Sequence, residues 1–235
     1  MRAPGTATLR VSVPRCVAVA VLFLFNAGAS ANAQATIAPP IHRLEVSLGV
    51  GLVGGADLGG QTAEERSSSA GATFGLFDTA TELGSAPAFD VRLGVAITSR
   101  FTVEGRASLS RPELRTSISG DTEGAPAITA VESVDQYLFD GGVAVRLGGR
   151  ATRLVPFVSA GAGYHRQLHE GQTLAEGGSL FYAGGGVTRW LVVRRQGLVR
   201  AAGFRADARL YFLSGGISPD TRRQAALSGG VTLVF

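Results

Sequence analysis

The sequence lacks several residue types on which other structural classes depend. It contains no lysine, and Cys16 is the only cysteine among its 235 residues. A single thiol cannot form an internal disulfide, and the chain after Cys16 contains no thiol that could take part in chemistry. Because every one of the 22 basic residues is arginine, the basic isoelectric point partly reflects the missing lysine. It therefore does not indicate a nucleic-acid partner.

Long apolar runs are also missing. No segment after the N-terminal region approaches 18 unbroken apolar residues, so no transmembrane helix is predicted. The N-terminal region itself has Arg2, Arg10 and Arg15 before an apolar run at 17–25, then small residues ending in Ala31-Asn32-Ala33. This order predicts a cleavable secretory signal at residues 1–33, exported by the Sec route, with Ala31 and Ala35 as alternative cleavage sites. A retained anchor would need about 20 apolar residues.

Processing after Ala33 would remove Cys16 and three arginines, which leaves 19 arginines against 18 acids. About 200 residues, 34–235, then remain, a length that suits one domain. Glycine is abundant, at 33 residues in the whole chain, roughly twice the usual ~7%.

Apolar and polar residues alternate over most of this domain, which predicts β-strands. Eight strands are expected, at 44–53, 89–98, 101–110, 130–147, 153–164, 180–192, 201–213 and 228–235. Longer loops at 54–86, 111–127, 165–178 and 214–222 alternate with short connections. Within the first loop residues 73–77 could extend a strand above the membrane, and strand ends could project into the second. An even strand number with loops of unequal length is typical of transmembrane barrels.

The two faces of these strands differ in composition. In the last strand Leu227, Val231, Leu233 and Phe235 share an apolar face, which we expect to contact lipid. The opposite faces carry five acids and five arginines, and an eight-stranded barrel is just wide enough for such side chains to fill it. The predicted interior charge network comprises Glu45, Asp90, Arg92, Glu104, Arg106, Asp140, Arg146, Arg205, Asp207 and Arg209.

Periodicity alone would equally fit a soluble eight-stranded barrel with its charges outside. The terminal Phe235, the signal sequence and the loop asymmetry together favour the membrane barrel. The facing of two strands stays open. Strand 180–192 can place Trp190 outward and Arg189 inside, or the reverse, and strand 153–164 has small apolar residues on both faces.

The domain resembles the small outer-membrane β-barrel family of the OmpA, OmpX and opacity-protein type. The resemblance is carried by the terminal segment, by Pro156–Tyr164 and by Arg209-Leu210-Tyr211. It implies an all-β, eight-stranded antiparallel transmembrane up-and-down β-barrel, integral to the bacterial outer membrane, with both termini in the periplasm. OmpA-like proteins often carry a peptidoglycan-binding domain after the barrel, whereas this sequence ends with the barrel, so the resemblance does not imply cell-wall anchoring.

The same resemblance implies an assembly signal read by the barrel assembly machinery, with periplasmic chaperones as further partners during biogenesis. That signal has a polar residue, a glycine two positions later, and apolar or aromatic residues three and five after the glycine. Ser228, Gly230, Leu233 and Phe235 match it.

Few residues suggest chemistry. His165, His169 and Glu170 could bind a metal or supply a base, as in barrel enzymes that act on lipid A, but solvated loop residues explain them better, and His42 is too far away. Arg194-Arg195 and Arg222-Arg223 could contact anionic lipid or lipopolysaccharide, or be solvated. Gly184–Gly186 lies within a strand and is no phosphate-binding loop. No catalytic, cofactor or metal site is expected.

Two function classes follow from the sequence. The first is a non-enzymatic outer-membrane barrel with a structural or surface-interaction role, in contact with outer-membrane lipid and lipopolysaccharide and with an unknown surface ligand. The alternative is a lipid-modifying barrel enzyme, a lipid A deacylase or acyltransferase. A narrow, porin-like solute pore is a third reading, which the filled interior disfavours.

Overall fold

The computed structural model describes residues 43–66, 73–147, 153–169, 174–194, 196–215 and 221–235. The predicted signal sequence, Glu170 and Arg195 lie outside these residues. Within the described ranges no helix is long and apolar enough to cross a membrane. The strands there are β1 (Leu44–Val53), β2 (Ala56–Arg66), β3 (Thr73–Leu83), β4 (Ala86–Ala96), β5 (Phe101–Ser110), β6 (Glu113–Ser119), β7 (Ile128–Ser133), β8 (Asp135–Arg146), β9 (Leu154–Leu168), β10 (Ala175–Val193), β11 (Ala201–Gly215) and β12 (Arg222–Val234).

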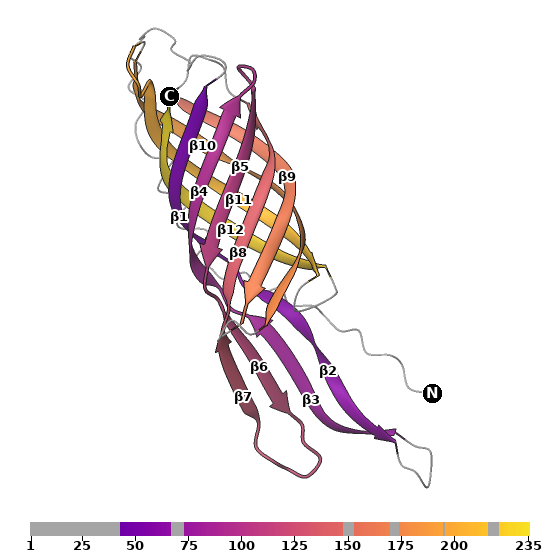
Figure 1. Ribbon diagram of the computed structural model, residues 1–235. Coiled ribbons are helices and arrows are strands. Elements are labelled where there is room, and N and C mark those ends of the chain that lie inside the picture. Colours follow the sequence, from indigo (N-terminus) through magenta and orange to yellow (C-terminus); the bar gives the residue numbers. More distant parts are fainter. Residues whose placement is uncertain (1–42, 67–72, 148–152, 170–173, 195, 216–220) are drawn as a thin grey trace. The chain divides into compact units, whose positions relative to one another are not determined.

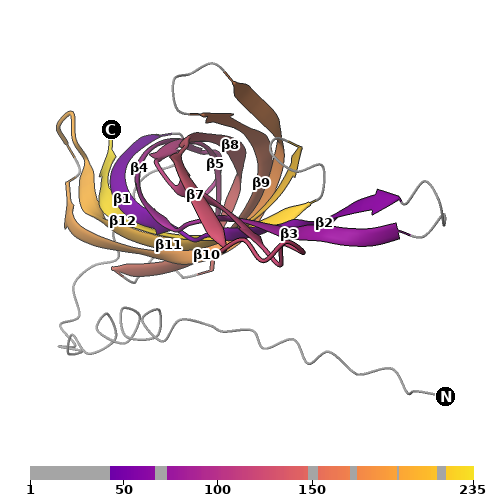
Figure 2. The ribbon, with the colours of Figure 1, turned by 90° about the horizontal axis from the view of Figure 1, so that it is seen from below.

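Eight of these strands close into an antiparallel barrel in the order β1-β12-β11-β10-β9-β8-β5-β4. Figure 2 shows the ring from one end. The last strand closes on the first over a long register, from Glu45 opposite Val234 to Val53 opposite Ala226. The predicted all-β, eight-stranded antiparallel barrel is confirmed.

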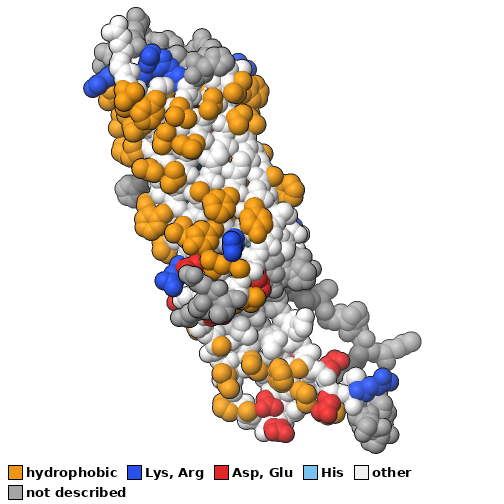
Figure 3. All heavy atoms as spheres, viewed as in Figure 1, with side chains coloured by type: hydrophobic (Ala, Val, Ile, Leu, Met, Phe, Trp, Pro, Cys, Tyr) orange, Lys and Arg blue, Asp and Glu red, His pale blue; other side chains and the backbone are white. Residues whose placement is uncertain are grey.

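Side chains alternate between the two surfaces of the barrel wall, most regularly in β4 and β5. Along β5 every second residue from Phe101 is exposed and each residue between is buried. The exposed side chains are large and apolar, with Phe89 66% and Leu48 62% exposed, and Figure 3 shows them spread over the outside of the barrel. The buried residues include most of the charged residues that lie on the barrel strands. This arrangement is the reverse of a soluble protein.

Four strands continue past one end of the barrel and form a second antiparallel sheet in the order β2-β3-β6-β7 (Figure 1). We call this sheet the strand extension. The prediction of a loop at 54–86 is therefore wrong over most of that segment, and the predicted loop at 111–127 is wrong at 113–119, which form β6. The suggested extension at 73–77 is confirmed within β3. Bulges in β2, between Asp57 and Gly60 and again between Ala63 and Glu64, break its two-residue period, which explains why the pattern was missed.

The strand extension is tied to the barrel and has its own small core. The amide of Gly54 donates to the carbonyl oxygen of Ala225 at 2.6 Å, and that of Gly84 to Glu113 at 2.7 Å. Leu83, Leu114 and Val134 are buried together against partly buried apolar residues of β2. The extension is thus an ordered element stabilised by hydrogen bonds and apolar packing.

Several barrel strands are longer than predicted. The strand expected at 153–164 runs to Leu168, the next begins at Ala175 rather than at 180, and β12 begins at Arg222. The open question in β10 is also decided, because Trp190 is buried inside the barrel and Arg189 faces outward at the strand end. In β9 the inward residues include Phe157, Ser159 and His165.

Candidate functional site

The interior of the barrel holds a network of charged side chains centred on Arg209. Its guanidinium donates to Asp140 Oδ1 at 2.6 Å, to Glu104 Oε1 at 2.8 Å and to Asp207 Oδ1 at 3.1 Å. The same group lies 4.3 Å above the ring centre of Tyr182. Arg209 therefore satisfies three carboxylates from three strands while the ring covers one of its faces.

The remaining arginines complete the network across the barrel. Arg92 Nη2 lies 2.9 Å from Asp207 Oδ2, and Arg205 Nη2 donates to Glu104 Oε2 at 2.9 Å. The Arg205 guanidinium also lies 4.0 Å above the ring of Phe157. These contacts join β4, β5, β9 and β11, so the network braces opposite walls of the barrel.

Arg106 links the network to a tyrosine hydroxyl. Its Nη2 lies 3.3 Å from Asp90 Oδ2, and its Nη1 donates to Tyr211 Oη at 3.1 Å. Tyr211 in turn donates to Asp140 Oδ2 at 3.2 Å. The central network thus contains four arginines and four carboxylates, and leaves no net charge buried.

The structure places all ten residues of the predicted charge set on the inner side of the barrel. Nine are buried, and Arg146, which is partly buried, forms a separate ion pair with Glu45 near one end. Sequence reasoning missed the two aromatic partners, Phe157 and Tyr182. They lie on strands of small residues in which neither face stood out by hydrophobicity.

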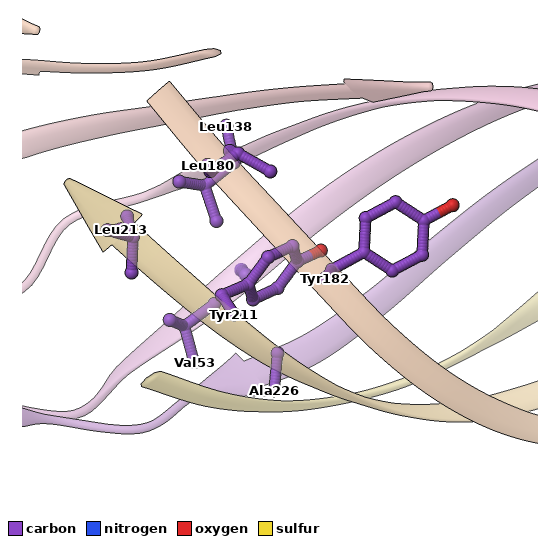
Figure 4. Packing of buried hydrophobic residues seen from close by; sticks show 8 residues of the cluster. Val53, Leu138, Leu180, Tyr182, Tyr211, Leu213 and Ala226 are labelled. Atoms are coloured by element: carbon purple, nitrogen blue, oxygen red, sulfur yellow. The ribbon is translucent and has the colours of Figure 1, made fainter. Parts of the chain in front are cut away.

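Apolar side chains cross the interior beyond the charged network, on the side of the strand extension. They come from six barrel strands, and Tyr211 and Leu180 have no exposed surface. Figure 4 shows side chains of this cluster. The cluster is Val53, Ala88, Leu138, Leu180, Tyr182, Tyr211, Leu213 and Ala226. A second apolar group, Trp190, Ala201 and Val234, lies at the opposite end.

The interior leaves very little free space. The void lined by Asp90, Arg92 and Asp207 has a volume of about 10 Å³, roughly the room of a single water molecule. A void of the same size lies near Glu45 and Trp190. Side chains therefore fill the described interior and leave no continuous path for a solute.

Polar side chains lie beyond the apolar cluster, at the barrel end next to the strand extension. Gln167 Nε2 donates to Gln136 Oε1 at 3.0 Å, and Gln136 Nε2 donates to Gln224 Oε1 at 3.0 Å. His165 is fully buried beside them in β9. The prediction that His165 is a solvated loop residue is wrong, because β9 continues four residues past Tyr164.

The two histidines do not share a site of the kind considered from the sequence. His169 lies at the end of β9, and its Nδ1 is 3.1 Å from Glu132 Oε1 of β7. This pair links the barrel to the strand extension. Across the described ranges no group of three or more His, Cys, Asp or Glu side chains is arranged to hold a metal ion.

The residues of the predicted assembly signal lie along the seam where the barrel closes. Ser228 is opposite Gly51, Gly230 opposite Gly49, and Leu233 opposite Val46. The amide of Phe235 donates to the carbonyl oxygen of Leu44 at 3.0 Å. Whether these residues act as a signal during assembly stays a prediction.

Comparisons with known proteins agree with this architecture. No family description and no curated protein matches the sequence. Among solved structures the chain is similar to the outer membrane protein OprG from Pseudomonas aeruginosa, at 10% identity and a TM-score of 0.53, over 83% of this chain and 96% of OprG. It is also similar to Neisserial surface protein A, at 12% identity and a TM-score of 0.53, over 82% of this chain and 97% of that protein. The fold is that of the small eight-stranded outer-membrane β-barrels.

Proposed function

We propose that the protein is an integral β-barrel of the bacterial outer membrane with a non-enzymatic, structural or surface-interaction role. The observation that carries this proposal is the reversed distribution of side chains, with large apolar residues outside and a neutral charge network inside. In water these large apolar side chains would stay exposed, whereas the hydrocarbon region of a bilayer would bury them. Outer-membrane lipid and lipopolysaccharide are then the direct neighbours of the barrel wall.

The proposal includes an orientation. The short β4–β5 turn and the C-terminal residue lie at one end of the barrel, and the strand extension begins at the other. Short turns face the periplasm in barrels of this type. We therefore assign the end with Arg100 and Phe235 to the periplasm and the strand extension to the cell exterior.

The strand extension is the element best suited to meet a partner. Ile128 and Val131 of β7 are 61% and 56% exposed, and Phe74 of β3 is also exposed. Strands β2 and β7 are the two edges of the sheet, and edge strands present unpaired backbone groups. Exposed apolar residues on an ordered sheet are a surface that a partner protein could cover.

Epitope tags would test both localisation and orientation. A tag inserted after Gly124, between β6 and β7, is expected to bind antibody on intact cells. The matched tag at Ser99, in the β4–β5 turn, is expected to bind only after the outer membrane is permeabilised. Recovery of the untagged protein in the soluble fraction would contradict the membrane assignment, and the reverse tag pattern would contradict the orientation.

Lipid modification is the alternative activity, and it has a direct test. The His169–Glu132 pair is the described imidazole–carboxylate contact that could serve as a base and its orienting group. Our proposal predicts that His169→Ala leaves the lipid A composition of cells unchanged by mass spectrometry. A change in acylation that depends on His169 would support the enzyme instead.

We also propose that Phe235 acts before folding, as part of the signal read by the barrel assembly machinery. Its side chain is one partly exposed aromatic at the barrel end, so its loss should weaken packing by at most about 1.5–3 kcal/mol. Phe235→Ala is expected to lower the amount of protein in the envelope far more than the urea midpoint of protein refolded in detergent. Normal envelope levels would contradict this role.

A further inference from the structure

Arginines surround the end of the barrel that carries the short β4–β5 and β10–β11 turns. Backbone hydrogen bonds fix their positions around the rim: the carbonyl oxygen of Arg43 accepts from Ala96, and that of Arg100 from Arg146. The carbonyl oxygen of Arg153 accepts from Trp190. We call this set the arginine collar. It comprises Arg43, Arg100, Arg153, Arg189, Arg194 and Arg200.

Three arginines of the collar have no carboxylate partner. Among the described residues Arg100, Arg153 and Arg194 are exposed and form no salt bridge. Glu45, the acid near this rim, points inward and pairs with Arg146. By contrast, Arg111 and Arg115, near and within the strand extension, each pair with a carboxylate.

Two collar cations also lie close together. Partial burial lowers the pKa of Arg43 from its ordinary value, and the positive charge of Arg200 lowers it further. One Nη atom of Arg43 is buried without a hydrogen-bond partner. Two guanidinium groups held this close add to the positive potential at the rim.

The apolar belt begins directly beside the collar. Leu44, Phe101 and Leu154, the first residues of β1, β5 and β9, are exposed on the outer face. Arg189 faces outward on the same surface, opposite Leu154 and Phe204. In Figure 3 blue arginine side chains lie at the upper end of the orange apolar surface, and others lie near its lower end and on the strand extension. An arginine beside lipid extends its guanidinium to the headgroup level.

The collar also carries an exposed apolar residue at its tip. Leu198, between Arg194 and Arg200 in the β10–β11 turn, is 82% exposed. A leucine between two arginines suits the boundary between acyl chains and headgroups. Charge and hydrophobicity therefore point to the same partner, a lipid surface.

We propose that the arginine collar binds the phosphate groups of anionic phospholipids such as phosphatidylglycerol, in the leaflet at the turn end of the barrel. A guanidinium donates two parallel hydrogen bonds to phosphate oxygens, which an ammonium group cannot do. The inference rests on the proposed function, because it requires the barrel to span a bilayer. In the proposed orientation the collar meets the phospholipid leaflet, and Arg166 and Arg223 lie at the opposite end.

Spin-labelled lipids provide the test. The mature chain is refolded into phosphatidylcholine vesicles with spin-labelled phosphatidylglycerol or phosphatidylcholine, and electron spin resonance gives the motionally restricted fraction of each. We expect phosphatidylglycerol to associate roughly fivefold more strongly, the factor that one arginine near an anionic surface supplies. The preference is expected to fall towards one in the triple variant R100Q/R153Q/R194Q and to persist in the matched control R166Q/R223Q.

The possible outcomes separate this inference from the proposed function. An undiminished preference in the triple variant, or its loss in the control, would overturn the collar as the binding surface. Stronger competition by unlabelled lipid A than by unlabelled phosphatidylglycerol would assign the collar to lipopolysaccharide and overturn the proposal. A wild-type chain that does not insert into vesicles at all would overturn the membrane function itself.

Discussion

Arg209 binds three carboxylates at once inside the barrel, from Glu104, Asp140 and Asp207. Its side chain is 1% exposed, so these contacts are shielded from bulk water. A buried ion network is weak evidence for high stability, since desolvation offsets much of the attraction. Removing one arginine from the network should nevertheless be strongly destabilising, because the remaining carboxylates stay buried without a partner.

Arg209→Met should therefore lower the free energy of unfolding by about 3–5 kcal/mol, the usual cost of an uncompensated buried charge. Urea unfolding of protein refolded in detergent micelles would measure the change. The control is Arg115→Met in the exposed pair with Glu113, which should change the midpoint little. Equal effects of the two substitutions would contradict the network's role in bracing the barrel.

The positions of the interior charges could be read from the sequence because each is flanked by apolar residues with a period of two. The positions of Phe157, Tyr182 and His165 could not. Glycines at 161, 184 and 186 leave both faces of β9 and β10 without a distinguishing side chain. The adjacent Arg189 and Trp190 each fit either face, and only the closed barrel places the indole inside.

At the scale of elements, the barrel strands were predictable and the strand extension was not. The barrel strands alternate without interruption, as β4 and β5 show. The β2–β3 pair contains bulges, and most residues of β2 and β7 are exposed, so no period of two marks these strands. These strands are held in place by hydrogen bonds to their neighbours. They are also held by the packing of three buried residues that are far apart in the sequence, Leu83, Leu114 and Val134.

Deleting β2 and β3, the first hairpin of the strand extension, tests whether the barrel folds independently of the extension. If residues 56–83 are removed so that Gly54-Gly55 leads into Gly84, the barrel should still close, because the β1–β4 register ends at Val53 and Ala86. Heat-dependent mobility in detergent gels should be retained. Protease should now cleave β6 and β7, since Leu114 and Val134 lose Leu83.

The comparison variant for this deletion is Leu138→Asp, which introduces an unpaired charge into the fully buried cluster of the barrel. It should abolish the folded form that the deletion preserves. Loss of the folded barrel in the deletion variant would show instead that the extension is required for barrel closure.

For the whole molecule, the filled interior predicts very low conductance. The charged network and the apolar clusters on both sides of it leave voids of about 10 Å³ rather than a channel. Purified protein in planar bilayers should therefore show no stable open state, in contrast to an open porin measured in the same bilayers. Large, steady, ohmic currents would show that the interior opens and would support the solute-pore alternative.

The central claim is that the apolar outer face of the barrel contacts lipid. The sequence after Cys16 contains no cysteine, so single cysteines can be spin-labelled without background. Labels at Val103, Ala107 and Leu109 lie on the outward face of β5, and a label at Thr129 lies in the exposed strand β7.

In vesicles, electron spin resonance can compare collisions with oxygen, which concentrates in the hydrocarbon, and with a water-soluble nickel complex. Our account predicts that the three β5 labels collide with oxygen and are shielded from nickel, whereas the Thr129 label is open to nickel. β5 labels as accessible to nickel as the label at Thr129 would show that the outer face is in water, and would contradict the account.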